Sequence, residues 1–185
     1  MRKMRLRNIA IILTGIALGT ASCVKQQLET TYTSQEKKID QYIEQNRVSN
    51  GDTLRVVYNG GSSRLVRIEG EGQELSSEGT IAFYYAGYAF GGSINKNNLF
   101  VTNHSQSAAE AGWTLTEEEA KVLTINIKDY ELIPGLKSGL IGVKGGEQCE
   151  ILFTGKYGFG KKAFGTVPAN SALVYKIWVE SISND

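Results

Sequence analysis

Few residues of this chain combine a reactive type with the spacing that metal, nucleophilic or acid–base chemistry needs. His104 is the only histidine, and without a second histidine or a cysteine at ligand spacing a zinc site has too few ligands. Cys149 alternates with Ile151 and Phe153, which predicts an inward-facing thiol on a strand. The acidic residues 117–119 are typical of a solvated helix start. We expect no metal and no cofactor, and His104 as a solvated loop residue.

Cys23 is the residue whose surroundings indicate a covalent modification. Before it come four basic residues, the apolar run Ile9–Leu18 and small residues, which is typical of a secretory signal peptide over residues 1–22. The small residues also resemble a bacterial lipobox, in which the cysteine receives diacylglycerol, although Thr20 stands where that motif usually has leucine. The alternatives are cleavage near Ala21 that leaves a free thiol, and an uncleaved anchor shorter than the ~20 residues of a membrane span.

Cleavage at this point changes the charge and the thiol content of the chain. Residues 1–22 carry four positive charges and no negative ones, so the formal net charge falls from +1 to −3. Nucleic acid is therefore not an expected partner. If Cys23 is lipidated, Cys149 is the only remaining thiol and no intramolecular disulfide can form.

The segment after Cys23 predicts a tether and then a helix. Residues 24–31 are polar without an apolar period, which predicts a linker. Thr33–Glu36 matches the capping-box pattern, so we expect a helix to begin there. Ile39, Tyr42 and Ile43 follow at helical spacing and give this helix one apolar stripe. The stripe either docks on the domain or pairs with another copy.

The rest of the chain consists of short β-rich segments separated by turn signals. Thr53–Tyr58 and Arg64–Ile68 flank an Asn-Gly-Gly sequence and predict a hairpin. One short helix is expected over Ile133–Ile141, with a proline in its first turn. Four segments rich in β-branched and aromatic residues predict further strands: Thr80–Phe90, Val122–Ile127, Gln148–Phe153 and Ala172–Ile182.

Three blocks in the C-terminal half carry a family pattern in chain order. Gly79–Gly87 ends in Tyr-x-Gly, and Leu132–Glu147 reads LIPGLKSGLIGVKGGE. The third block is Tyr157–Gly160 followed by Val167–Tyr175. Together, from about Glu78 to Ser183, they resemble the FKBP family of peptidyl-prolyl cis-trans isomerases. The resemblance implies an α+β fold in which a twisted antiparallel β-sheet wraps round one short helix.

These patterns predict four parts of the chain. Residues 1–22 form the signal peptide, and residues 23–32 the lipidated cysteine and linker. Residues 33–77 form an N-terminal helix and hairpin extension, and residues 78–185 the FKBP-like isomerase domain.

The resemblance also implies a pocket that holds the proline ring of a peptide between sheet and helix. Rotation about an Xaa-Pro bond needs no nucleophile or cofactor, because apolar surroundings favour the twisted amide over the charge-separated planar one. The backbone amide of Ile133 would hold a substrate carbonyl. The implied catalytic residues are Tyr85, Phe100, Ile133, Phe159 and Tyr175, and the implied secondary walls are Leu123, Leu132, Leu136 and Val167.

The chain departs from the family pattern at several positions. Leu136 stands where the family places the tryptophan of the pocket floor, which predicts a shallower or differently shaped floor. Phe159 replaces a tyrosine, and Val101 replaces an acidic residue, so two polar groups are missing. The connection that follows is longer than usual; Thr114–Ala120 predicts a helix start, and Trp113 could lean over the pocket. Plain core packing is the alternative for each pocket aromatic.

These expectations lead to three functional hypotheses. The first is a prolyl isomerase that acts on proline-containing exported polypeptides at the cell envelope, held by lipid on the periplasmic or outer-membrane face. The second is a catalytically weak or inactive peptide-binding module, which the substitutions at Leu136, Phe159 and Val101 favour. The third is a chaperone in which the stripe of Ile39, Tyr42 and Ile43 makes a homodimer.

Overall fold

A computed structural model describes the backbone of residues 3–49 and 51–185, with side chains from Val24 onward apart from residue 50. The chain divides into two compact units, Met1–Ser34 and Gln35–Asp185. The predicted signal peptide, residues 1–22, and the side chain of Cys23 lie outside the side chains described. Within the described residues, no helix contains a stretch long and apolar enough to span a membrane.

The first helix differs from the prediction. Helix α1 runs from Lys3 to Asn46, so the expected helix start at Thr33 is wrong, and residues 23–32, the predicted linker, are helical. The lysine, glutamines, leucine and glutamate after Val24 are good helix formers. Thr30 and Thr31 also donate their hydroxyl groups to carbonyls four residues earlier, at 3.0 and 2.9 Å. Polarity does not identify a linker here, because polar residues also build exposed helices.

The apolar stripe of α1 belongs to the second unit and packs on its sheet. Ile39, Tyr42 and Ile43 are buried, and the Tyr42 ring lies edge-on to Phe90 at 5.4 Å. These side chains share a cluster with residues of four strands, β5 (Thr80–Ala89), β6 (Leu99–Thr102), β8 (Gln148–Phe153) and β9 (Leu173–Ser183). Docking on the domain is thus confirmed, and these three side chains are not exposed for contact with a second copy. The homodimer stays a prediction.

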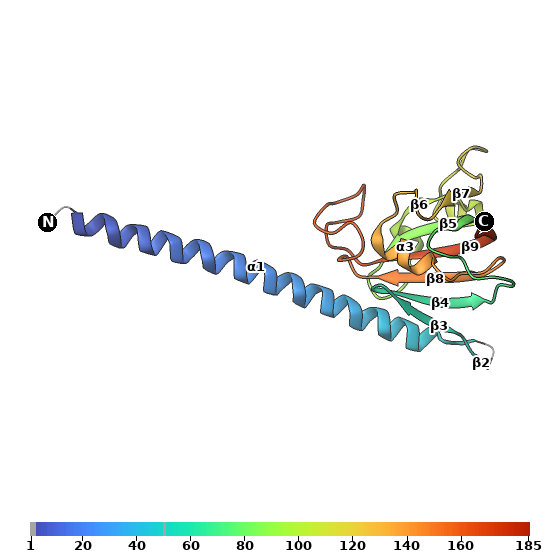
Figure 1. The fold of residues 1–185 in the computed structure, drawn as a ribbon, viewed down its shortest axis with the longest axis horizontal. Helices are drawn as coiled ribbons and strands as arrows, with labels where there is room; N and C mark the ends of the chain where they lie inside the picture. The colour runs from blue at the N-terminus through green and yellow to red at the C-terminus, as the bar shows by residue number, and fades with distance from the viewer. Residues whose placement is uncertain (1–2, 50) are drawn as a thin grey trace. The chain divides into compact units, whose positions relative to one another are not determined.

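Seven antiparallel strands form the main sheet (Figure 1), in the order β3-β4-β8-β9-β5-β6, with β7 also paired to β5. A small separate pair, β1 (Val48–Ser49) and β2 (Asp52–Thr53), precedes it. The strands of the main sheet are β3 (Val56–Asn59), β4 (Ser62–Ile68), β5 (Thr80–Ala89), β6 (Leu99–Thr102), β7 (Leu123–Asn126), β8 (Gln148–Phe153) and β9 (Leu173–Ser183).

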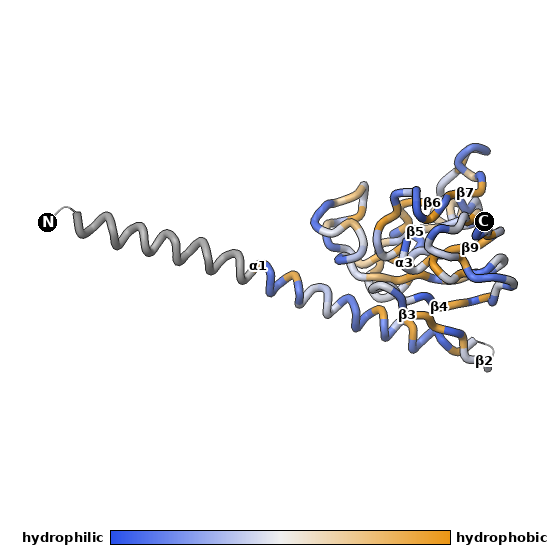
Figure 2. Tube along the Cα trace, in the orientation of Figure 1, coloured by the Kyte–Doolittle hydropathy of each residue, from blue (hydrophilic) through white to orange (hydrophobic). Residues whose placement is uncertain are grey.

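The two faces of the sheet bury two different clusters. On one face, α3 (Pro134–Leu140) packs on β4 and β8 over the larger cluster. On the other face lies the cluster that covers the end of α1. The alternation within β8 shows the division, because Phe153 belongs to the first cluster and Leu152 to the second. Figure 2 shows hydrophobic residues along the strands and mostly hydrophilic residues along α1 beyond residue 23.

The predicted fold class, an antiparallel sheet with one short helix and an N-terminal helix, is confirmed. The hairpin is also present, and β4 pairs along its length with β8, so the hairpin belongs to the main sheet. The structure gives a tighter turn than predicted, with Gly60 and Gly61 both at positive φ. A one-turn 3₁₀ helix, Lys96–Asn98, precedes β6.

The long connection between β6 and β7 differs from its prediction in two places. The helix there is α2 (Ser105–Glu110), whereas Thr116 and Glu119 exchange capping hydrogen bonds around a turn. Among the described residues no helix follows that turn before β7 begins at Leu123. Trp113 is 41% exposed and is not among the residues that pack on the larger cluster.

His104 is not a solvated loop residue. Its side chain caps α2 by accepting from the backbone amide of Ser107, and its ring stacks on Trp178 at 3.8 Å. Burial lowers the pKa of His104; Glu110 opposes this shift, and Lys176 adds to it. The prediction failed because the stacking partner comes from β9, far along the chain.

Candidate functional site

The structure brings all nine predicted pocket residues together around the larger cluster. They come from β5, β6, β7, the start of α3, the turn after β8, the loop before β9, and β9 itself. Three are buried within the cluster, and six are half-buried and pack against it, so the six keep one side open to solvent. The buried set is Leu136, Val167 and Tyr175, and the half-buried set is Tyr85, Phe100, Leu123, Leu132, Ile133 and Phe159. Their role in catalysis remains a prediction.

Phe100 is the centre of the aromatic walls. Its ring is perpendicular to Tyr175, with centroids 5.9 Å apart, and lies edge-on to Phe159 at 5.8 Å. Such edge-to-face pairs fix the orientation of each ring. The rings therefore form a rigid, apolar wall that joins β6, β9 and the turn after β8.

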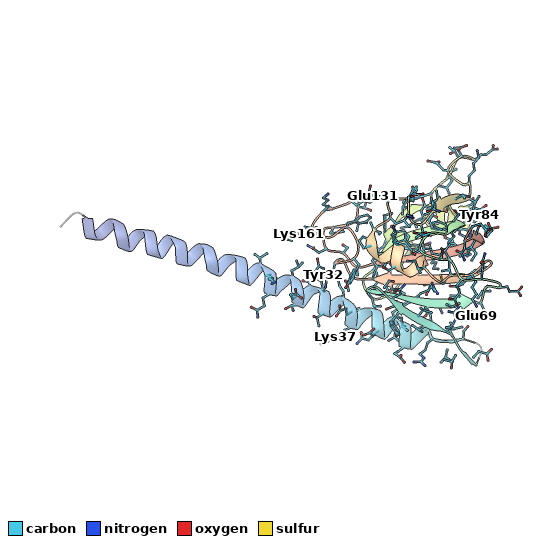
Figure 3. The ribbon with its side chains drawn as sticks, in the orientation of Figure 1. Tyr32, Lys37, Glu69, Tyr84, Glu131 and Lys161 are labelled. Atoms are coloured by element: carbon cyan, nitrogen blue, oxygen red, sulfur yellow. The ribbon has the colours of Figure 1, made fainter. Side chains whose placement is uncertain are left out.

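Phe164 extends this wall and was missed by the sequence analysis. It lies in the loop between β8 and β9, in which Lys161 is labelled in Figure 3. Its ring stacks on Phe159 with centroids 4.6 Å apart, and it is 50% exposed. Two backbone hydrogen bonds to Val167 hold it in place. The sequence signal that could have identified Phe164 is a large aromatic residue in a loop rich in glycine and lysine.

Phe153 supplies aromatic surface beneath the start of α3, where Leu136 is smaller than the family's tryptophan. A Cβ atom on Gly135 would lie 2.3 Å from Cγ of Phe153, so the helix rests directly on this ring. Phe153 also stacks on Tyr175, with centroids 6.1 Å apart. The sequence indicated only that Phe153 faces inward, because α3 and β8 meet only in the folded chain.

Ile133 presents a backbone donor at the edge of these walls. It precedes Pro134 and has extended dihedral angles, φ −60° and ψ 141°, as the residue before a proline does. Gly135 donates to the carbonyl of Tyr157 at 2.8 Å, which fixes the first turn of α3. Among the described residues, the N–H of Ile133 has no acceptor. It is therefore available to a carbonyl oxygen of a bound peptide.

The predicted pocket residues include the hydroxyl groups of two tyrosines but no charged side chain. Burial raises the pKa of Tyr175, and the nearby Tyr85 raises it further. Burial likewise raises the pKa of Tyr85, with a smaller contribution from Tyr130. Both hydroxyl groups therefore stay protonated at neutral pH. Tyr130, 46% exposed, is a further aromatic near the pocket that the sequence analysis missed.

The arrangement suits the binding of an apolar ring next to an amide. The walls are apolar, and the position after Phe100 is the half-buried Val101. In the part of the chain whose side chains are described, no three His, Cys, Asp or Glu residues gather into a metal-binding group. Cys149 is buried, and burial is the main cause that raises the pKa of its thiol, so it is not a nucleophile.

Comparison with known proteins agrees with this geometry. The family model of the FKBP-type peptidyl-prolyl cis-trans isomerases matches residues 44–180. "FK506-binding protein 1" of Aspergillus oryzae is 26% identical over 117 residues, which are 63% of this chain and 94% of that protein.

Solved structures are similar in fold. The crystal structure of FkpA from Escherichia coli is similar with a TM-score of 0.53 and 19% identity, over 95% of this chain and 71% of that chain. The N-terminal domain of FKBP42 from Arabidopsis thaliana is similar with a TM-score of 0.53 and 17% identity, over 75% of this chain and 100% of that chain.

Proposed function

The chain belongs to the FKBP-type peptidyl-prolyl cis-trans isomerase family, and from this premise we propose that it accelerates Xaa-Pro rotation in exported polypeptides at the cell envelope. We choose this site for the substrate because the predicted residues lie together around Phe100 and Tyr175. In this proposal the proline ring enters between those rings and Ile133.

The physical basis of the proposed catalysis is differential binding of the twisted amide. The planar amide is polarised by resonance, and rotation has a barrier of roughly 18–20 kcal/mol because that resonance is lost. Apolar walls such as Tyr85 and Phe100 stabilise the less polar twisted state more than the planar one. The free N–H of Ile133 would hold the substrate carbonyl and keep the peptide in register while the bond turns.

The substitutions at Val101 and Phe159 make weak activity the expected outcome. Phe159 lacks a hydroxyl group that could donate to a peptide or ligand carbonyl, and Val101 lacks a carboxylate that could accept a hydrogen bond. The loss of one neutral hydrogen bond costs about 0.5–1.5 kcal/mol, or roughly tenfold at most. We therefore propose an isomerase with reduced affinity for its substrate.

The same substitutions favour a second candidate function, a peptide-binding or chaperone module without useful catalysis. Leu136, Phe159 and Val101 leave the apolar walls in place while they remove the family's floor tryptophan and polar groups. Such a module would bind extended apolar peptides with no preference for proline.

Isomerisation of Xaa-Pro tetrapeptides by the full chain tests the first candidate against the second. The Tyr85→Ala variant should lose most of the activity. Tyr84→Ala is the matched control, because Tyr84 is adjacent on β5 and contacts His104, a residue outside the pocket. Activity lost only in Tyr85→Ala supports the isomerase and its site; binding without catalysis in every form would favour the second candidate.

The cellular location rests on Cys23 and the sequence before it. We propose that the chain is cleaved before Cys23 and anchored by lipid on that thiol. Cells that express the chain should incorporate an alkyne-tagged fatty acid into it, and the Cys23→Ala variant should lose the label. Equal labelling of Cys149→Ala serves as the control, and an unlabelled wild-type chain would exclude the anchor.

A further inference from the structure

A second groove lies beside the predicted proline pocket and shares none of its nine residues. Its volume is ≈ 340 Å³. It is bounded by Glu36, Ile39 and Asp40 of α1, by residues 58–63 of the β3–β4 hairpin, and by Thr154 and Tyr157 beyond the end of β8. All of these belong to the compact unit Gln35–Asp185.

Two carboxylates on one face of α1 give the groove a negative edge. Glu36 and Asp40 stand four residues apart, which places their Cβ atoms about 6 Å apart on adjacent turns. Both are exposed, and neither forms an ion pair with any residue whose side chain is described. Lys37 is not among the residues that line the groove. The two charges are therefore available to a cation.

Two tyrosine rings form the opposite side. Tyr58 is 66% exposed and Tyr157 is half-buried. An ammonium or guanidinium group is attracted to the face of such a ring. The ammonium group of Lys156 already lies 5.4 Å from the centre of the Tyr157 ring, so the exposed ring of Tyr58 is the one left for a second cation.

Thr154 provides an independent indication of a ligand. This residue is 2% exposed and lines the groove. Its hydroxyl group has no hydrogen-bond partner among the described residues. A buried hydroxyl group without a partner is costly, and such groups in native proteins usually have one. A polar group of a ligand would supply it.

The groove and the proline pocket meet at one turn. Tyr157 lines the groove, and Phe159, two residues later, is a wall of the pocket. Two residues span at most about 7 Å, so this turn links a wall of the groove to a wall of the pocket. Gln35 fixes α1 at this place, because it accepts from the amide of Gly155 at 2.9 Å and donates to the carbonyl of Asn170 at 2.7 Å.

We propose that this groove binds an arginine or lysine side chain of the same polypeptide whose Xaa-Pro bond occupies the proline pocket. The inference rests on the proposed isomerase function and narrows its substrate class to prolyl segments with a basic residue a few positions away. Glu36 and Asp40 pair with the cation, the Tyr58 ring covers it, and the groove supplies the affinity that the pocket lacks without polar groups at positions 101 and 159.

A peptide series tests the proposal on the full chain. Each peptide contains one Leu-Pro pair and one arginine two to five residues from the proline, and each has a partner peptide with glutamine in place of arginine. Dissociation constants come from fluorescence anisotropy, and kcat/KM from isomerisation. The test variant is Glu36→Gln with Asp40→Asn. The control, Glu117→Gln with Glu180→Gln, removes the same charge from exposed sites outside the groove.

For the best-placed arginine, the wild type and the control variant should bind the arginine peptide about three- to tenfold more tightly than its glutamine partner. In the test variant that ratio should fall to about one, with isomerisation of the glutamine peptide unchanged. Equal binding of both peptides by the wild type would overturn the proposal that the groove binds a basic side chain. The same loss of the arginine preference in both variants would also overturn it. If no peptide is isomerised but the preference for the arginine peptide still depends on Glu36 and Asp40, the isomerase proposal fails and the proposed binding of a basic side chain in the groove is supported.

Discussion

Nε of Arg64 lies 3.2 Å from Oε1 of Glu147, and both side chains are almost completely buried, at 3% and 0% exposure. The guanidinium group of Arg64 also donates to the carbonyl groups of Gly139, Ile141 and Gly142 at 2.8 to 3.0 Å. These carbonyls lie at the C-terminal end of α3, where a helix leaves acceptors without partners. One buried ion pair thus holds the helix whose other end presents Ile133.

Arg64→Leu should destabilise the fold strongly, because it leaves the carboxylate of Glu147 buried with only the more distant, partly exposed Arg55 at 3.3 Å. Loss of one partner of a buried ion pair typically costs about 3–5 kcal/mol. Urea unfolding of the full chain measures the loss. Arg47→Leu is the control, because it breaks an exposed pair with Glu44 and should cost less than about 1 kcal/mol. Equal losses in both variants would contradict a structural role for the buried pair.

Gly135→Ala should destabilise the protein by about 1–3 kcal/mol, because the new methyl group would overlap the ring of Phe153. Isomerase activity should also fall, since α3 would shift and carry Ile133 with it. Thermal unfolding and the peptide assay measure the two effects. Adding Phe153→Leu should restore part of the lost stability. Gly91→Ala is the control, because a Cβ atom at that position would enter open space and the substitution should be nearly neutral.

Phe159→Tyr should strengthen substrate binding, because it adds a hydroxyl donor at the rim of the pocket. One neutral hydrogen bond corresponds to about 0.5–1.5 kcal/mol, so KM should fall by about two- to tenfold with little change in the unfolding temperature. Steady-state isomerisation over a range of peptide concentrations measures the change. An unchanged KM would mean that substrate carbonyls do not reach position 159.

Stability should depend on pH through His104. Burial lowers the pKa of His104 in the folded protein, so the unfolded chain binds the proton more readily. Neutral His104 makes its full contribution to folding stability above the pKa of a histidine in the unfolded chain, about 6.5. This contribution is lost as the pH falls through that value toward the lower pKa of His104 in the folded protein.

The comparison of wild type with His104→Asn isolates this effect, because asparagine keeps the cap on α2 but does not titrate. Urea unfolding at pH 7.5 and 5.5 should show a larger loss of stability on acidification in the wild type. The same loss in both proteins would exclude His104 as the source.

The sequence by itself determined the local elements and the family. Period-two segments, a proline in the first turn of α3 and the glycine-rich hairpin each encode one short element, since backbone preferences act within a few residues. The family resemblance then implied nine pocket residues, and the structure brings them together. At residues 23–32 the polar composition did not predict the helix, because polar residues are compatible with either a linker or an exposed helix.

Only the tertiary structure decided which distant residues meet. Phe153 lies under Gly135, Phe164 covers Phe159, and Trp178 stacks on His104, and each contact joins segments that share no local pattern. The groove beside Tyr157 likewise exists only because α1 packs against the end of the hairpin. Side-chain packing between remote segments depends on the shape of the whole core, and for that reason a local pattern in the chain does not specify it.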